Sequence, residues 1–312
     1  MAEEIRISDG GDLPPSGTPL TDDCVQPFMI DRTGLHGRMV KLGASVDTIL
    51  SRHGYPDPVA YLLGEMLALC AGLAAALKFD GVFTLQTKGD GPVPMLVADV
   101  TSGGKMRGYA QVKGEVPPLH DVVAAPIPKL LGQGYLAFTV DQGSDMERYQ
   151  GIVALEGATV EECVQRYFEQ SEQFASTVKL CAGRRDDGSM AASALLVQRL
   201  PDEGGNEDIG KADSDAWRRA VALMSSAKPE EMLDPGLPPN DLLYRLFHED
   251  GVRVFPPQEL VEECRCSRSK IEGVLKSLEP GALDDLKLDN GLIEVTCEFC
   301  SRTESFSDAD LA

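Results

Sequence analysis

Long apolar runs and an export signal are missing from this chain of 312 residues. Its first twenty residues, MAEEIRISDGGDLPPSGTPL, have neither the basic start nor the apolar stretch of a secretory signal peptide. The most apolar stretch, residues 62–77, is interrupted by Glu65 and is short for a membrane span, so we expect a buried helix. We therefore expect a cytoplasmic protein with no membrane partner, whose cysteines stay reduced.

Basic residues are also scarce. The chain has 29 Lys and Arg against 50 Asp and Glu, which gives a net charge of −21. Nucleic-acid-binding proteins need a basic surface, so we expect no nucleic acid partner. Residues 251–312, with 7 basic and 13 acidic side chains, are no exception.

Catalytic and nucleotide-binding motifs are absent as well. Gly89, Gly91 and Gly103 match neither G-x-x-x-x-G-K-[ST] nor G-x-G-x-x-G and indicate turns instead. His36 has no evident nucleophilic or acidic partner, which favours a surface or packed histidine. The sequence therefore predicts that the protein is not an enzyme.

What is present indicates a folded, strand-rich protein with 43% apolar residues. For residues 1–201 we predict an α+β domain, and the resemblance described below implies that it is the substrate-binding core. The predicted strands are an edge strand at Cys24–Ile30 and further strands at 34–43, 81–112, 130–157 and 189–201. Two helices are predicted: one from Asp57-Pro58 to about Phe79, and one capped by Thr159 that continues to about Phe174.

Residues 202–257 are predicted to form an acidic helical linker. Residues 202–215 are acidic, carry glycine and lack large apolar side chains apart from one isoleucine, as linkers do. Two apolar helix faces follow, formed by Trp217, Ala220, Val221 and Met224, and by Leu242, Leu243, Leu246 and Phe247. These faces need a neighbour to pack on, so the segment is either a removable cover or an ordinary interdomain connector.

Residues 258–312 contain two close cysteine pairs: C-x-C at Cys264 and Cys266, and C-x-x-C at Cys297 and Cys300. Two tight turns that each supply two thiolates can complete a tetrahedral metal site. Sulfur ligands favour zinc, copper(I) or iron–sulfur. Cys24, Cys70, Cys163 and Cys181 occur singly, and we expect them to be packed or inert.

The sequence around these cysteines predicts a zinc ribbon. A capping box at 269–272 opens a helix whose apolar stripe is Ile271, Val274, Leu275 and Leu278. A short helical segment, the Asn290-Gly291 turn and a strand at 292–296 then lead directly into Cys297. The metal is either a structural staple or part of a redox switch, because a module this small depends on it to fold.

The whole chain resembles the redox-regulated 33 kDa heat-shock chaperones, which are ATP-independent holdases of the bacterial cytosol. The resemblance covers nearly the full length in order and includes both cysteine pairs. The other matching stretches are GLHGRMVKLG, LLGEMLALCAGLAAALKFDGVFTLQTKGDGPVPMLVADVT, RGYA, LLGQGYLAFTVDQGSDMERYQGIVALEG and LLYRLFHED.

This resemblance implies that Cys264, Cys266, Cys297 and Cys300 bind one Zn²⁺ in a reduced, inactive monomer, with the linker folded over an apolar surface. Oxidation would form the disulfides Cys264–Cys266 and Cys297–Cys300, release zinc, and unfold first the module and then the linker. The resulting homodimer would hold unfolded or partly unfolded client proteins. We expect Cys297–Cys300 to form first, because a C-x-C disulfide closes a very small ring. Arg265, Arg268, Lys270 and Arg302 are expected to temper the thiolate charge.

Two other functions stay open. A constitutive binding scaffold with a purely structural zinc site would lose binding on oxidation instead of gaining it. A thiol–disulfide oxidoreductase using Cys297 and Cys300 is disfavoured, because that chemistry needs C-x-x-C at a helix start in a βαβ setting.

Overall fold

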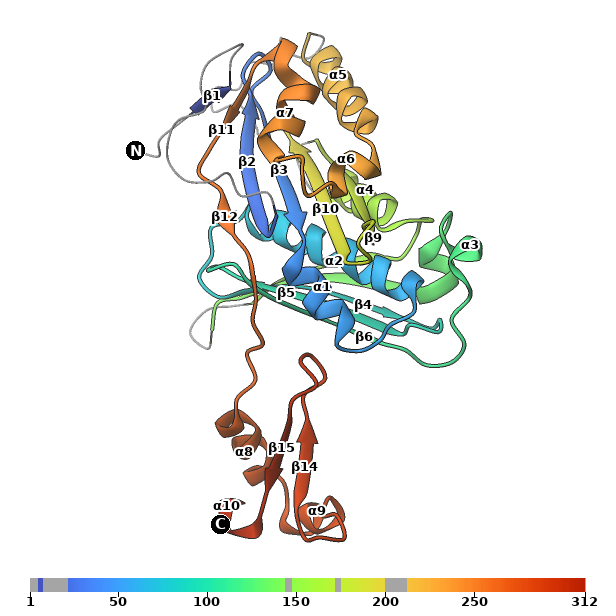
Figure 1. Cartoon of the computed structure of the whole chain (residues 1–312), viewed down its shortest axis with the longest axis vertical. Helices are drawn as coiled ribbons and strands as arrows, with labels where there is room; N and C mark the ends of the chain where they lie inside the picture. The colour runs from blue at the N-terminus through green and yellow to red at the C-terminus, as the bar shows by residue number, and fades with distance from the viewer. Residues whose placement is uncertain (1–4, 8–21, 144–147, 172–174, 200–211, 312) are drawn as a thin grey trace. The chain divides into compact units, whose positions relative to one another are not determined.

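The computed structural model describes residues 5–7, 22–143, 148–171, 175–199 and 212–311 (Figure 1). The chain divides into two compact units, Met1–Glu262 and Glu263–Ala312, and each is described by itself. The division into a core at 1–201, a linker at 202–257 and a metal module at 258–312 stays a prediction. Most of the acidic stretch at 202–215 lies outside the described residues.

The first unit contains two sheets, and the first sheet has the strand order β1-β11-β2-β3-β10-β9, with β12 also paired to β2. Its strands are β1 (Ile5–Ile7), β2 (Cys24–Ile30), β3 (Leu35–Leu42), β9 (Ser176–Arg184), β10 (Met190–Gln198), β11 (Val252–Val254) and β12 (Gln258–Glu259). The prediction that β2 is an edge strand is wrong, because β11 and β12 pair with the side of β2 that faces away from β3.

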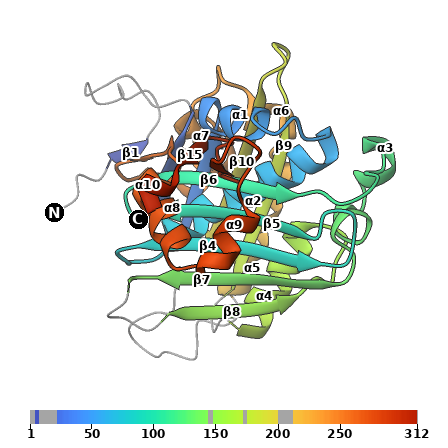
Figure 2. The ribbon, with the colours of Figure 1, turned by 90° about the horizontal axis from the view of Figure 1, so that it is seen from below.

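The second sheet has the order β13-β6-β5-β4-β7-β8, and Figure 2 shows β6, β5, β4, β7 and β8 side by side. Its strands are β4 (Val82–Gly89), β5 (Met95–Thr101), β6 (Lys105–Gln111), β7 (Gly134–Asp141), β8 (Tyr149–Ala154) and β13 (Val261–Glu262). All pairs are antiparallel except β13 with β6. The predicted strand regions and their glycine turns are confirmed.

Helix α2 (Asp57–Ala74) packs between the two sheets and forms the centre of the main core. It is long and apolar enough to cross a membrane, but it is mostly buried within the protein, as a core helix is. It ends before Phe79, and Pro56 takes the N-cap position predicted for Asp57, whose carboxylate instead pairs with Arg184 at 2.8 Å. A Cβ on Gly72 would lie 2.4 Å from Leu196 Cδ1, so glycine lets α2 approach β10 closely.

The remaining helices of this region are short or lie at its rim. They are α1 (Ala44–Ser51), α3 (Leu119–Val122), a π-helical turn (Ile127–Leu131) and α4 (Val160–Ser171). Thr159 Oγ1 accepts a 3.3 Å hydrogen bond from the Glu162 N–H, which confirms the predicted cap of α4. The last residues predicted for this helix, 172–174, lie outside the described part of the chain.

The predicted linker contributes α5 (Ala212–Ser226), α6 (Pro229–Leu233), α7 (Pro239–Phe247) and a 3₁₀ turn (His248–Asp250). Figure 1 shows these helices lying along the first sheet. Alternate residues of β10 pack against α2 and against the linker: Leu196 belongs to the main core, and Leu195 and Val197 to the linker side. Because both faces are covered, all nine residues of β10 are buried.

The second unit is small. It contains α8 (Arg268–Lys276), α9 (Pro280–Asp285), the antiparallel hairpin β14 (Ile293–Thr296) and β15 (Thr303–Phe306), and α10 (Asp308–Leu311). Its buried core consists of Leu275, Ile293 and Phe306. Two residues of the apolar stripe predicted for α8 are not buried. Val274 is 63% exposed, and Leu278 is exposed and follows the end of the helix.

Candidate metal centre and linker surface

The four paired cysteines come together in the second unit. The sulfur atoms of Cys264, Cys266, Cys297 and Cys300 all lie within 4.8 Å of one another. The Sγ atoms of Cys264 and Cys297 are 3.7 Å apart, and those of Cys266 and Cys300 are 3.4 Å apart. These distances exceed the ~2.05 Å of a disulfide, so the cluster consists of four thiols.

The C-x-C half of the cluster is held by the start of α8. Ser267 directly follows Cys266, and its Oγ accepts a 3.3 Å hydrogen bond from the Lys270 N–H. Ser267 is therefore the N-cap, two residues before the predicted Ser269. The Lys270 ammonium donates a 2.9 Å hydrogen bond to the Arg265 carbonyl oxygen, which fixes the turn between the two cysteines.

The C-x-x-C half forms the tip of the β14–β15 hairpin. The Cys297 N–H donates to the Arg302 carbonyl oxygen at 2.9 Å, and the Ser301 N–H donates to the Cys297 carbonyl oxygen at 2.8 Å. Ser301 has a φ of 56°, the left-handed conformation that lets the chain reverse here. The strand predicted to enter Cys297 is present, and the turn directs both thiols to the same side.

The thiols differ in their readiness to ionise. Burial raises the pKa of Cys264, but hydrogen bonds from the Cys266 N–H and the neighbouring thiols outweigh burial and bring the pKa to about 7. Burial, followed by the neighbouring thiols, raises the pKa of Cys266, and burial raises the pKa of Cys300. A thiolate is the metal-binding form of cysteine, so the lowered pKa of Cys264 favours metal binding by this thiol.

Arg268, one of the four cations expected to temper the thiolate charge, makes its contacts with other groups of the module. Its guanidinium lies 4.3 Å over the Phe306 ring, pairs with Asp310 at 3.2 Å and Glu304 at 3.4 Å, and donates to the Ser305 carbonyl oxygen. Arg268 therefore ties α8 to β15 and α10.

The donor set fits a tetrahedral metal ion. Zinc–thiolate bonds of ~2.3 Å place neighbouring sulfur atoms ~3.8 Å apart in a tetrahedron, close to the separations of 3.7 and 3.4 Å found here. The four thiols can therefore hold a metal ion after small shifts, and their softness is consistent with zinc.

The predicted linker residues lie on the first sheet. Met224, Leu242, Leu243, Leu246 and Phe247 are buried in one cluster together with side chains of the sheet. We call this interface between the linker and the sheet the linker surface. The Phe247 ring stacks on Phe28 of β2 with centroids 5.7 Å apart. Trp217 packs partly buried against this surface, and so does Leu223, whereas Val221 is half-buried outside it. The sheet contributes Phe28, Ile30, Leu35, Met39, Cys181, Leu195, Val197, Val252 and Val254.

Cationic side chains of the first unit also hold the linker, through its main chain. Lys41 of β3 is 1% exposed, and its ammonium donates to the carbonyl oxygens of Asp234 and Leu237. Lys179 of β9 donates to the Ser225 carbonyl oxygen at 2.7 Å, and Arg185 donates to that of Leu233 at 2.9 Å. Sequence reasoning missed these residues; the buried position of Lys41 within an apolar strand was the available signal.

The remaining candidates from the sequence are the four single cysteines and His36. Cys24, Cys70, Cys163 and Cys181 are buried, as predicted for packed cysteines. The Cys70 thiol donates a 3.2 Å hydrogen bond to the Ala98 carbonyl oxygen, and burial raises its pKa. His36 is half-buried on β3, and burial lowers its pKa. These groups are poor nucleophiles or bases in their surroundings.

Comparison with known proteins gives consistent matches. A sequence model of the family described as Hsp33 protein matches residues 23–307. A 33 kDa chaperonin of Caulobacter vibrioides is 41% identical over 290 residues, covering 91% of this chain and 95% of the relative. A 33 kDa chaperonin of Escherichia coli is 35% identical over 290 residues, covering 93% and 94%.

A solved structure shares the fold. The crystal structure of a 33 kDa chaperonin (heat shock protein 33 homolog) from Thermotoga maritima superposes with a TM-score of 0.78 at 24% identity. The match covers 93% of this chain and 96% of that protein. This similarity confirms the predicted α+β fold with a small cysteine-bearing module.

Proposed function

The chain belongs to the Hsp33 protein family, and from this membership we propose that it is a redox-regulated, ATP-independent chaperone. In the reduced, zinc-bound form the protein is inactive, because the linker covers the surface that binds clients. Oxidation of the four thiols uncovers that surface. The relatives named above are chaperonins by name, which supports chaperone activity rather than enzymatic catalysis.

The observation that carries the proposal is the apolar character of what the linker covers. Phe28, Met39 and Leu195 of the sheet are at most 1% exposed because α5 to α7 pack on them. Removal of the linker would expose a broad, continuous apolar patch, and patches of this kind mark sites of protein binding. Unfolded or partly unfolded proteins expose matching apolar segments.

The zinc ion would be held by Cys264, Cys266, Cys297 and Cys300, and when bound it keeps the thiols deprotonated and the module folded. On oxidation by hydrogen peroxide, one thiolate attacks a peroxide oxygen, the O–O bond breaks, and a sulfenic acid forms as hydroxide leaves. The neighbouring thiolate attacks that sulfur and displaces a second hydroxide. When each disulfide forms, its two thiolates transfer two electrons to one peroxide molecule. The products are the disulfides Cys264–Cys266 and Cys297–Cys300.

The metal module is connected to the linker helices by the intervening chain segment. Cys264 follows β13 after one intervening residue, and β13, β12 and β11 join the module to α7. In the first unit, Glu262 of β13 forms two hydrogen bonds with the Arg52 guanidinium at 2.6 and 2.7 Å. We propose that unfolding of the module frays these short strands and then detaches α7, α6 and α5. The active form is a cytoplasmic homodimer, and the reduced form is a monomer.

Aggregation of thermally unfolding citrate synthase, measured before and after peroxide treatment with zinc release in parallel, tests the proposal. We expect suppression of aggregation only after oxidation, together with release of one zinc ion per chain. If the reduced form suppresses aggregation and oxidation abolishes it, the zinc is purely structural and the protein is a constitutive binder. Catalytic reduction of insulin would indicate an oxidoreductase.

A further inference from the structure

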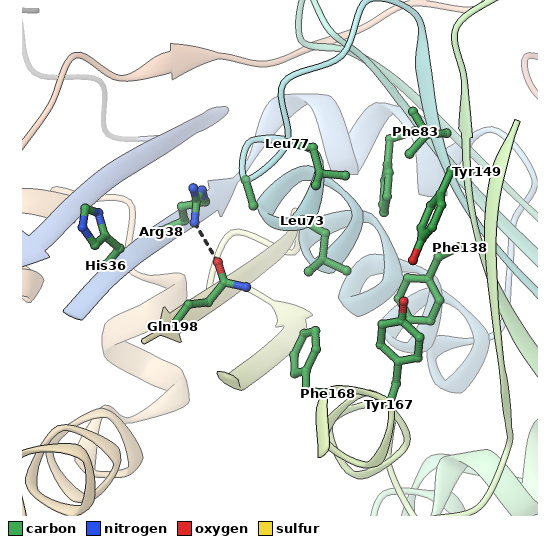
Figure 3. A pocket seen from close by; sticks show the side chains of 12 residues that line it. His36, Arg38, Leu73, Leu77, Phe83, Phe138, Tyr149, Tyr167, Phe168 and Gln198 are labelled. Atoms are coloured by element: carbon green, nitrogen blue, oxygen red, sulfur yellow. Dashed lines mark hydrogen bonds between the residues drawn. The ribbon is translucent and has the colours of Figure 1, made fainter. Parts of the chain in front are cut away.

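A cavity of about 240 Å³ lies on the other side of the first sheet, away from the linker surface. It is formed by the end of α2, by β4, β7 and β8 of the second sheet, by α4, and by β3 and β10. Its apolar walls are shown in Figure 3. They include Leu73, Leu77, Phe83, Phe138, Tyr167 and Phe168.

The polar end of this cavity is formed by Arg38 and Gln198. Arg38 Nη1 donates a 3.1 Å hydrogen bond to Gln198 Oε1, while the buried Arg38 Nε has no hydrogen-bond partner. Among the described residues, no carboxylate pairs with Arg38. Burial lowers the pKa of this guanidinium, but an arginine stays protonated in proteins. A partly buried cation with an unpaired N–H group therefore lines a mainly apolar space.

This combination is unusual, because charged groups inside proteins are normally paired. Elsewhere in the first unit, Arg52, Arg107 and Arg185 each pair with a carboxylate at 2.6 to 2.8 Å. His36 also lines the cavity, but an imidazole is either neutral or cationic and supplies no negative charge. Within the described part of the chain, the partner that Arg38 lacks is an anion.

We propose that this cavity is a binding site for a small amphipathic monocarboxylate, whose carboxylate pairs with Arg38 and whose apolar tail lies among the aromatic side chains. Arg–carboxylate pairs are the strong, geometrically specific polar contacts of proteins. The aromatic rings supply the apolar contact area. The site is distinct from the linker surface, and the inference does not depend on the proposed chaperone function.

The size of the cavity sets the length of the tail. An apolar cavity of about 150 Å³ accommodates benzene, so 240 Å³ accommodates a larger group, on the order of an eight- to ten-carbon chain. Tyr149, which is 63% exposed, and Leu77, which is 47% exposed, lie at the entrance. A ligand of this class can therefore enter from solvent without displacing the core.

Isothermal titration calorimetry on the reduced, zinc-loaded full chain tests the site, with decanoate as the probe, decanamide as the uncharged analogue and acetate as the tail-free analogue. We expect saturable binding of one decanoate, at least about ten-fold tighter than decanamide, and no binding of acetate. Arg38→Gln should remove the preference for decanoate. Lys113→Gln, the same charge change at an exposed position outside the cavity, should keep it.

A second variant covers the case in which Arg38→Gln does not fold. Ala76→Phe adds bulk to the cavity wall and should weaken decanoate and decanamide alike. Decanoate should also shift the methyl resonances of Leu73 and Leu77, but not those of Leu242 and Leu243 on the linker surface. Equal affinities for decanoate and decanamide, or decanoate binding that survives both substitutions, would overturn the proposal.

Discussion

The ammonium group of Lys41, on β3, donates a 2.7 Å hydrogen bond to the main-chain carbonyl oxygen of Leu237, between α6 and α7. The same ammonium donates to the Asp234 carbonyl oxygen. A buried lysine in the first sheet thus holds the linker by its backbone. This contact restrains the linker without depending on the side chains of the linker itself.

Replacing this lysine should loosen the linker. Lys41→Met keeps the aliphatic stem but leaves the Leu237 carbonyl oxygen without its donor, and an unsatisfied buried group costs about 1–3 kcal/mol. The Asp234 carbonyl oxygen keeps its 3.2 Å hydrogen bond from the Leu237 N–H. We expect faster hydrogen exchange at residues 229–247 and partial suppression of client aggregation without oxidant. Lys88→Met, the same change at an exposed position on β4, is the control and should alter neither. Unchanged exchange in Lys41→Met would show that apolar packing alone holds the linker.

The aromatic contact between the sheet and the linker should matter at least as much. Phe247 is fully buried against Phe28, and a Phe→Ala change in a core costs about 3–5 kcal/mol. Because the lost contact joins the linker to the sheet, Phe247→Ala should weaken the packing of the linker. The variant should therefore bind clients in the reduced form. Phe83→Ala removes a ring that is 3% exposed from the main core, and it should lower overall stability without detaching the linker from the sheet. Equal aggregation suppression by both variants would contradict this.

Residues with strong local signals could be placed from the sequence. The apolar helix α2, the strands around the glycine turns and the hairpin that carries Cys297 and Cys300 follow from periodicity and turn chemistry. The four thiols converge as their spacing predicts. The apolar faces at Met224 and at Leu242 to Phe247 indicated packing on a neighbour, although not on which one.

The features that could not be predicted from the sequence depend on contacts between residues far apart in the chain. Strand β11 pairs with β2 across more than two hundred residues, so no local pattern shows that β2 is not an edge. Helix α8 carries an apolar stripe, but the unit has too few residues to bury Val274. Ser267 and Ser269 are equally good caps by residue type, so residue type alone does not show that Ser267 is the cap. The roles of Lys41 and Arg38 likewise depend on segments far away in the sequence.

Removal of the metal should unfold the second unit selectively. Its core has only three buried apolar residues, while structural zinc supplies about 10–16 kcal/mol of apparent binding free energy. Treating the reduced protein with a strong zinc chelator should therefore make residues 263–312 sensitive to protease, while α2 and the two sheets stay resistant. Cys297→Ser should reproduce the effect without chelator, and Cys163→Ser, a buried cysteine outside the cluster, should not. Protease resistance of the module after complete chelation would contradict this dependence.

Stability of the first unit should fall as the pH rises, because of Glu65. Burial, with a contribution from the charge of Glu161, raises the pKa of Glu65 to about 8 from an ordinary value of 4.5. Between these values the folded state keeps a proton that the unfolded state has lost, so the free energy of unfolding decreases as pH increases. The effect is absent below the lower value and reaches its full size above the upper one.

Urea unfolding of the wild type and of Glu65→Gln at pH 6 and pH 8.5 measures this effect. The glutamine has no proton to lose, so we expect a smaller loss of stability between the two pH values in the variant. Glu169→Gln, on the exposed side of α4, should behave like the wild type. If Glu65→Gln and the wild type lose the same stability, another group causes the pH dependence.

The packing of Arg268 predicts how firmly the module holds its metal. Its guanidinium joins three elements, α8, β15 and α10, through Phe306, Glu304 and Asp310. Arg268→Ala removes these contacts and leaves Phe306, one of three buried apolar residues, partly uncovered. Because folding of the module and metal binding are coupled, a less stable fold binds zinc more weakly.

We expect Arg268→Ala to lose zinc at lower chelator concentration and to respond to lower peroxide concentration. Lys276→Ala removes an exposed pair with Glu272 at 3.0 Å, away from Phe306, and should titrate like the wild type. If Arg268→Ala also titrates like the wild type, the four thiols alone determine zinc retention, and the module does not contribute through its packing.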